Sequence, residues 1–275
     1  MSVTSLRFAG LMVLVVLLTS CSGALSSSAA VGSPEFYWNA AKETYAAGDY
    51  LKTVDDLDHL METRSEYTAR AVPWSLVLTA GMANGYMELA DTYASAAREN
   101  KTQALPLRRR ANDYRTMASP LALRFAQNVE KMDQLPAGAV PVAFPMPKGS
   151  GAEPELFTRI LKGEALSQAD SETAVTLAIQ RNVLLAACEA VGAPGDMAKA
   201  EHILTNVSTA SHATFGKAIA AMLEHQSKLY SRNQLDEPEK LAILHQRAQT
   251  VLNGGAQLGG AMLVEARVDN PSGKK

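Results

Sequence analysis

The histidine and acidic side chains are the groups in this sequence whose spacing would most readily reveal metal or acid–base chemistry. The five histidines are His59, His202, His212, His225 and His245. None stands in an HExxH motif and no two lie three or four residues apart, so no pair of metal ligands on one helix face is predicted. The acidic run at residues 55–59 would fan out over several faces of a helix. We therefore expect a solvated polar surface there, and no metal site.

The sequence also contains no recognisable motif for nucleophilic catalysis or for cofactor binding. The sequence contains no GxSxG, P-loop or dinucleotide-binding motif. The adjacent pairs Glu201-His202 and Glu224-His225 point to different sides of a helix, which favours surface positions over a catalytic dyad. Cys188 lies on an apolar helical stripe, which predicts a buried and unreactive thiol. The sequence thus predicts a protein that is not an enzyme and that needs no cofactor.

The triplet Arg108-Arg109-Arg110 is the strongest local concentration of positive charge. It makes the helix expected over 104–132 basic, and two interpretations remain open. The arginines either form a solvated helix face or contact anionic lipid headgroups or an acidic partner. Nucleic acid is not expected as a partner, because the whole chain carries a net charge of −2.

Aromatic residues make up only 6% of the chain, yet most of them precede residue 115. Most are expected in the core. Some could instead line a groove between helical hairpins, since concave helical repeats bind peptides or small ligands with such side chains. The candidate groove residues are Trp38, Tyr45, Trp74, Tyr86 and Tyr93.

The amino terminus combines a positive charge, an apolar run and a cysteine. Arg7 precedes the apolar residues 8–18, a run too short to span a bilayer but typical of a signal peptide. The sequence LTSC at residues 18–21 then resembles the bacterial lipobox. The resemblance implies that residues 1–20 are a lipoprotein signal peptide cleaved before Cys21, and that Cys21 is acylated, palmitate included, on its sulfur and new amino group. An ordinary secretory signal with an incidental cysteine is the alternative.

Double acylation would anchor the protein stably to a membrane. Ser22 follows the cysteine where Asp would mark retention in the inner membrane, so the resemblance favours the outer membrane of a bacterial envelope, facing the periplasm. Residues 21–33 are the acylated cysteine and a run of small uncharged residues, which predicts a flexible tether spanning roughly 20 Å. Cleavage would leave Cys188 as the one cysteine besides Cys21, so no intramolecular disulfide is expected once Cys21 is acylated.

From Pro34 onward the apolar residues recur with a helical period, and no convincing alternating run predicts a strand. We therefore predict an all-α fold of antiparallel helical hairpins, either an irregular repeat or a bundle. In the long helix that carries Trp74 and Tyr93, Gly81 and Gly85 share one side, where a missing Cβ would let another backbone approach closely. Ser119-Pro120 is expected to kink or split the helix over 104–132.

The predicted helices fall into two lobes joined by a segment rich in proline and glycine. The N-terminal lobe (34–133) contains helices over 35–47 and 50–61 followed by the two long ones. In the segment 134–154, Val140, Val142, Phe144 and Met146 alternate, which predicts an extended strap docked on the helical body. The C-terminal lobe (155–269) is expected to contain helices over 154–163, 171–191, 196–209, 212–231 and 237–253, and residues 270–275 to form a frayed tail.

Two helix junctions share a pattern of small and apolar residues. Gly48-Asp49 follows Ala41, and Gly195-Asp196 follows Cys188, at the same offset. The segment YAAGDYLKTVDDLDHL resembles a tetratricopeptide hairpin, which implies a turn at the glycine and close packing of two helices. Any αα-hairpin could select the same residues, and the two junctions are too far apart for a regular array. Together with the lipobox, the irregular helices also resemble, more weakly, the T-component lipoproteins of tripartite transporters.

These features predict a lipid-anchored envelope protein whose helical body binds a protein or peptide partner. A small-molecule-binding accessory of a periplasmic transport system is the alternative. An enzyme that hydrolyses or modifies the cell wall is disfavoured, because no nucleophile–base or metal spacing is present.

Overall fold

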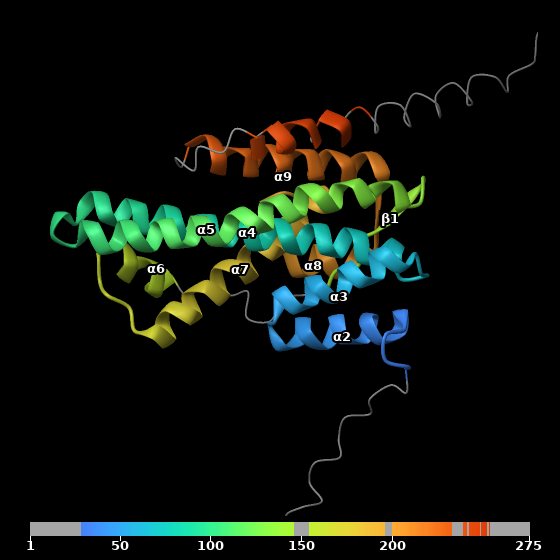
Figure 1. The fold of residues 1–275 in the computed structure, drawn as a ribbon, viewed down its shortest axis with the longest axis horizontal. Helices are drawn as coiled ribbons and strands as arrows, with labels where there is room; N and C mark the ends of the chain where they lie inside the picture. The colour runs from blue at the N-terminus through green and yellow to red at the C-terminus, as the bar shows by residue number, and fades with distance from the viewer. Residues whose placement is uncertain are drawn as a thin grey trace, which may run out of the picture.

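The computed structural model describes residues 29–145, 154–195 and 200–232, together with residues 239–253 apart from 241, 248 and 252. Over these residues the fold is all-α, as predicted, with one very short pair of strands (Figure 1). The segment predicted as a signal peptide, Cys21, most of the predicted tether, Met146, Asp196 and the segment predicted as a C-terminal tail lie outside the described residues.

The first two helices form the hairpin that the sequence predicts. Helix α2 (Pro34–Ala47) is capped by the Ser33 side chain, and Gly48 ends it in a left-handed conformation with φ of 85°. Helix α3 (Tyr50–Thr63) follows at once because the Asp49 side chain accepts a hydrogen bond from the Lys52 amide. Gly48 lets the chain reverse within two residues, so the two helices pack against each other.

The long pair α4 (Thr68–Glu99) and α5 (Ala104–Asn128) forms the centre of the molecule (Figure 1). The 3₁₀ helix η1 (Lys101–Gln103) joins them, and η2 (Val129–Gln134) follows α5. Pro120 lies inside α5 without splitting it. Its neighbours Ala118, Leu121 and Ala122 are buried in the core, and this packing offsets the one backbone hydrogen bond that proline removes.

The proline-rich strap docks on the helical body at the described residues. Val140 and Val142 are fully buried and Phe144 nearly so, which confirms the predicted docking. The prediction of no strands was wrong in one detail. Strand β1 (Ala139–Pro141) pairs antiparallel with β2 (Thr209–Ser211), but three residues are too few to produce a visible alternation in the sequence.

The remaining helices surround α4 and α5. Helices α6 (Pro154–Leu161) and α7 (Gln168–Ala190) run along one side, and α9 (His212–Arg232) along another (Figure 1). The short α8 (Ala200–Asn206) precedes β2, so the helix predicted over 196–209 ends earlier than expected. Residues of the segment 239–253 that are described are helical.

The turn after α7 differs from the predicted one. Gly192 adopts φ of 82°, its amide donates to Glu189 O, and the next amide donates to Cys188 O. Gly48 ends α2 through the same pair of bonds, with its own amide donating to Tyr45 O and the next amide to Thr44 O. The structural counterpart of Gly48 is therefore Gly192, not Gly195, which shifts the apparent sequence repeat out of register.

One hydrophobic core contains residues from both predicted lobes. It extends from Ala41 in α2 to Leu244, and the strap residues Val140 and Val142 belong to it. Cys188 is buried in this core, as predicted. A second, smaller cluster also joins the two predicted lobes, with Leu89 and Tyr114 beside Ile160. Helix α4 contacts α3, α5, α6, α7 and α9.

Candidate binding cleft

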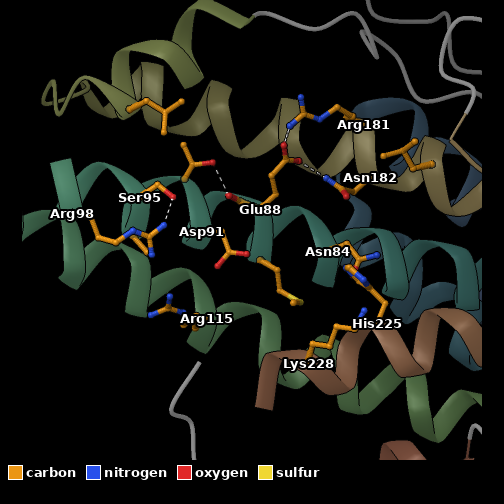
Figure 2. A pocket seen from close by; sticks show the side chains of 15 residues that line it. Asn84, Glu88, Asp91, Ser95, Arg98, Arg115, Arg181, Asn182, His225 and Lys228 are labelled. Carbon is orange, nitrogen blue, oxygen red and sulfur yellow. Dashed lines mark hydrogen bonds and ion pairs between the residues drawn. The ribbon is translucent and has the colours of Figure 1, made fainter. Parts of the chain in front are cut away.

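A cleft of about 920 Å³ lies on α4 between α7 and α9 (Figure 2). Polar residues of α4 form its floor. Arg181 and Asn182 line it from α7, His225 and Lys228 from α9, and Arg115 from α5. Its volume lies within the range of small-molecule sites.

The α7 side of the cleft is fixed by Glu88. The Asn182 amide donates to one Glu88 oxygen at 2.7 Å, and Arg181 forms an ion pair with the other. The Arg181 guanidinium also lies 4.8 Å from the centre of the Phe157 ring. The charges of Glu88 and Arg181 therefore cancel, and these two side chains shape the wall without adding net charge.

The rest of the cleft carries more positive than negative charge. Arg98 and Arg115 line it together with Lys228, against the single carboxylate of Asp91. Arg98 donates to Ser95 Oγ at 2.9 Å, and Arg115 donates to Asn112 Oδ1 at 3.0 Å. Such a surface favours a ligand that carries at least two negative charges.

Two buried polar atoms of the cleft residues have no hydrogen-bond partner among the described residues. They are Arg115 Nε, a donor, and Asn84 Oδ1, an acceptor. A buried polar group without a partner costs free energy, and such groups are rare in folded proteins. Both atoms are shielded from solvent, so a ligand would bond them only after neighbouring side chains move.

His225 is a titratable group of the cleft whose pKa is shifted by its surroundings. Burial lowers its pKa below the ordinary histidine value, the nearby Lys228 lowers it further, and Asp91 opposes the shift. The imidazole is therefore neutral at pH 7. An anion bound beside it would favour the protonated form.

Three of the predicted groove residues form an aromatic cluster away from the cleft. Trp38 contacts Trp74 edge to face with ring centres 5.6 Å apart, and Trp74 contacts Tyr45 at 5.3 Å. Tyr45 and Trp74 are only 6% and 3% exposed. These rings join α2 to α4 within the core, so Tyr45 and Trp74 line no open groove.

The other two predicted aromatics, Tyr86 and Tyr93, both pack against Tyr114 of α5. Burial raises the pKa of Tyr93 to about 12, so its hydroxyl stays protonated. Tyr86 and Tyr114 line a smaller hollow of about 590 Å³, which Arg110 also borders. The structure thus brings one predicted groove residue next to one residue of the arginine triplet.

The arginine triplet is split between two surroundings. Arg110 borders the smaller hollow, whereas Arg108 and Arg109 are exposed on the outer side of α5. Within the described part of the chain, neither Arg108 nor Arg109 takes part in an ion pair.

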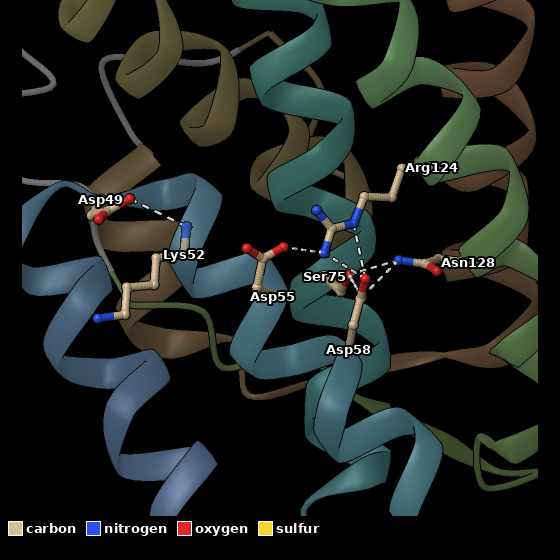
Figure 3. A network of polar contacts seen from close by, with 7 residues as sticks. All are labelled: Asp49, Lys52, Asp55, Asp58, Ser75, Arg124 and Asn128. Atoms are coloured by element: carbon tan, nitrogen blue, oxygen red, sulfur yellow. Dashed lines mark hydrogen bonds and ion pairs between the residues drawn. The ribbon is translucent and has the colours of Figure 1, made fainter.

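The acidic run at residues 55–59 is only in part the solvated surface that we expected, since Asp55 is 62% exposed but the other carboxylates are not. Asp58 accepts hydrogen bonds from Arg124 Nε at 2.9 Å and from the Asn128 amide at 3.1 Å, and Asp55 pairs with the same arginine at 2.7 Å (Figure 3). Asp56 is buried, and burial raises its pKa. Asp55 and Asp58 therefore join α3 to α5, whereas Asp56 interacts with Thr44 of α2.

The sequence analysis missed most of the cleft. Glu88 and Asn182 are 94 residues apart in the chain, so no local pattern links them. A signal did exist within α4, where polar residues recur every three or four positions in an otherwise apolar helix. They are Asn84, Glu88, Asp91, Ser95 and Arg98.

The pair Glu224-His225 behaves as expected for adjacent helical residues. Glu224 Oε1 lies 3.2 Å from His245 Nδ1, whereas His225 lines the cleft. The two side chains therefore take part in different surroundings, and they form no dyad.

Two further findings bear on the site. No helix within the described residues is long and apolar enough to cross a bilayer. In the same residues no group of three or more His, Cys, Asp or Glu side chains is placed to hold a metal ion. Comparison with known proteins finds no matching family model, no similar curated protein and no similar solved structure.

Proposed function

We propose that this chain is a lipid-anchored protein of the bacterial cell envelope whose helical body binds an acidic segment of a protein partner in the cleft on α4. The observation that carries the proposal is the excess of positive charge in the cleft, from Arg98, Arg115 and Lys228 against Asp91. The lipobox resemblance at residues 18–21 supports the anchor. The proposal assigns no catalytic activity and no cofactor.

The length of the cleft favours a peptide segment as its occupant. Its floor follows α4 from Asn84 to Arg98, which at ~1.5 Å per residue is about 21 Å. An extended peptide rises ~3.3 Å per residue, so roughly six residues would fill the cleft. Carboxylates spaced along such a peptide could reach cations at both ends of the floor.

Photocrosslinking in growing cells tests the partner directly. A photoreactive amino acid in place of Thr92, which lines the cleft, is expected to yield a defined crosslinked protein. The double substitution Arg98→Gln and Arg115→Gln should abolish that product. The matched control, Lys52→Gln with Arg70→Gln, removes two exposed cations outside the cleft and should leave it unchanged. A product that persists without Arg98 and Arg115 would contradict the proposed site.

A small molecule is the second candidate occupant, because the volume of about 920 Å³ suits one. It would correspond to an accessory protein of a transport system. Native mass spectrometry of the purified full chain separates the two candidates. A bound mass of small-molecule size that disappears in the Arg98→Gln, Arg115→Gln variant would favour transport over partner binding.

The anchor is tested independently of the cleft. Cys21→Ser removes the thiol that acylation requires, so the variant is expected to leave the membrane fraction after cell lysis and salt washing. Continued sedimentation with membranes would argue for a different mode of attachment.

A further inference from the structure

The α4–α5 hairpin ends in a surface that combines positive charge with exposed leucines. We name this surface the hairpin tip, and it consists of Lys101, Leu105, Arg108, Arg109, Leu161 and Lys162. In Figure 1 the hairpin end reaches the far left of the long axis. No residue of the hairpin tip belongs to the aromatic clusters, and only Leu161 touches the cleft.

The first turns of α5 have one buried face and one exposed face. Leu107, Ala111 and Tyr114 are buried in the core. Leu105 and the two arginines that follow it by three and four positions share the opposite side, because a helix turns once in 3.6 residues. Leu105 is 62% exposed, although packing it against the protein would lower the free energy.

A contact between distant parts of the chain enlarges this surface. The Asn100 side chain donates to Leu161 O at 3.3 Å, which ties the end of α6 to the end of the hairpin. Leu161 is 47% exposed, and the exposed Lys162 follows it. The tip thus joins two exposed leucines and four cations from segments about 60 residues apart.

The charged side chains of the hairpin tip itself are all positive. Its acidic neighbours in sequence are Glu99, Asp113 and Glu164, and Glu164 is already paired with Arg159 at 3.1 Å. Within the described residues, Lys101, Arg108, Arg109 and Lys162 form no ion pair. A surface of this kind is complementary to a plane of anionic headgroups with an apolar layer beneath them.

We infer that the hairpin tip docks on an anionic lipid surface, with the cations among the headgroups and Leu105 and Leu161 at the acyl boundary. The described chain begins at α2, toward the other end of the long axis (Figure 1). A body tethered at that end and docked at the hairpin tip lies along the bilayer. This orientation rests on the lipid anchor of the proposed function, whereas the docking itself does not.

Hydrogen–deuterium exchange of the full chain tests the docking. The protein is measured with vesicles of pure phosphatidylcholine and with vesicles that contain one third phosphatidylglycerol. Exchange at residues 100–109 and 161–163 is expected to slow only with phosphatidylglycerol. High salt should remove the protection, because it screens exposed charges. Equal exchange in the two kinds of vesicle would overturn the inference.

Charge variants identify the residues responsible. Each cation near an anionic membrane strengthens binding about fivefold, so Arg108→Gln with Arg109→Gln should weaken docking roughly 25-fold. Leu105→Ser keeps the charge and should weaken it about fivefold through lost apolar contact. Lys52→Gln with Arg70→Gln, the control of equal charge, should retain full protection. Protection unaffected by the arginine pair would overturn the inference.

The experiment also separates this inference from its alternatives. Flotation of the full chain with pure phosphatidylcholine vesicles, and its loss in Cys21→Ser, reports on the anchor alone. If added envelope proteins slow exchange at the hairpin tip and phosphatidylglycerol vesicles do not, the surface is a protein contact and the inference is overturned.

Discussion

Gly81 of α4 and Val183 of α7 lie so close that a Cβ atom on the glycine would fall 2.5 Å from the Val183 Cα. Gly85, one turn later, has the same relationship to Ile179, at 2.9 Å. The two backbones therefore meet along one turn of each helix. This contact sets the position of α7, and with it the wall of the cleft that Arg181 and Asn182 form.

Gly81→Ala is accordingly expected to destabilise the protein. The new methyl group meets backbone atoms, which cannot move aside like the end of a side chain, so the loss should be about 1–3 kcal/mol. Chemical denaturation monitored by circular dichroism measures it. Gly138→Ala is the control, because nothing lies within 4 Å of a Cβ there. Equal stability of both variants would mean that α4 and α7 are further apart.

Gly48→Val tests the turn between α2 and α3. Gly48 adopts φ of 85°, a conformation that a β-branched residue strongly disfavours. We expect a loss of about 1–3 kcal/mol, measured as a lower melting temperature. Gly48→Asn should cost less, because asparagine tolerates the left-handed region better. No difference between Val and Asn would contradict the backbone assignment.

Local features of the sequence predicted much of the fold. Gly81 and Gly85 indicated the close approach before any partner was known, because only a missing Cβ allows it. The alternation of Val140, Val142 and Phe144 indicated docking of the strap in the same way. In both cases the feature depends on residues within a few positions of one another, so a local sequence pattern predicts it.

Features that depend on distant partners were missed. The acidic run taken alone predicts a solvated surface. It belongs to an ion-pair network only because the fold places Arg124 of α5 next to Asp55 and Asp58. The turn after α7 was assigned to Gly195 because glycine can adopt φ > 0 at either position, and the sequence alone does not separate it from Gly192. The cleft has residues from several helices, which only the packing of α7 and α9 on α4 brings together.

Asp58→Ala is expected to destabilise the contact between α3 and α5. It leaves the half-buried Arg124 and the buried Asn128 amide without their shared acceptor. Arg124 keeps its ion pair with Asp55, and the Asn128 amide keeps Ser75 Oγ as an acceptor. Loss of the hydrogen bonds to the charged Asp58 should still cost about 1–3 kcal/mol, measured by urea denaturation. Asp55→Ala, at a side chain that is 62% exposed, should cost less than about 1 kcal/mol. Equal losses for the two variants would show that burial of the Asp58 contacts contributes nothing.

The lowered pKa of His225 predicts how the stability of the protein changes with pH. Burial lowers its pKa in the folded state, so the unfolded chain, where histidine titrates near ~6.5, binds more protons below that pH. Stability is therefore lost as the pH falls below about 6.5. His225→Asn should reduce the drop in melting temperature between pH 7 and pH 5.5. The exposed His202→Asn should leave the drop unchanged, and an unchanged drop in both would remove His225 as its source.

Tyr45 makes a direct connection between α2 and the strap. Its hydroxyl donates a hydrogen bond to Pro145 O at 2.7 Å, across 100 residues of sequence. Burial raises the pKa of Tyr45 well above its ordinary value, so the hydroxyl keeps its proton and stays a donor at physiological pH. The ring itself packs against Trp74 and Tyr50, contacts that phenylalanine would preserve.

Tyr45→Phe should therefore loosen the strap without unfolding α2. Loss of one hydrogen bond is expected to lower the free energy of unfolding by about 1 kcal/mol, and limited proteolysis should cut faster near the exposed Ala143. Tyr37→Phe is the control, because it removes a hydroxyl from the same helix while the Tyr37 ring stacks on His59 of α3. Rapid cleavage of the unchanged protein within residues 138–150 into two separable fragments would show that the strap is a free linker, since a docked chain with buried Val140 and Val142 resists the protease.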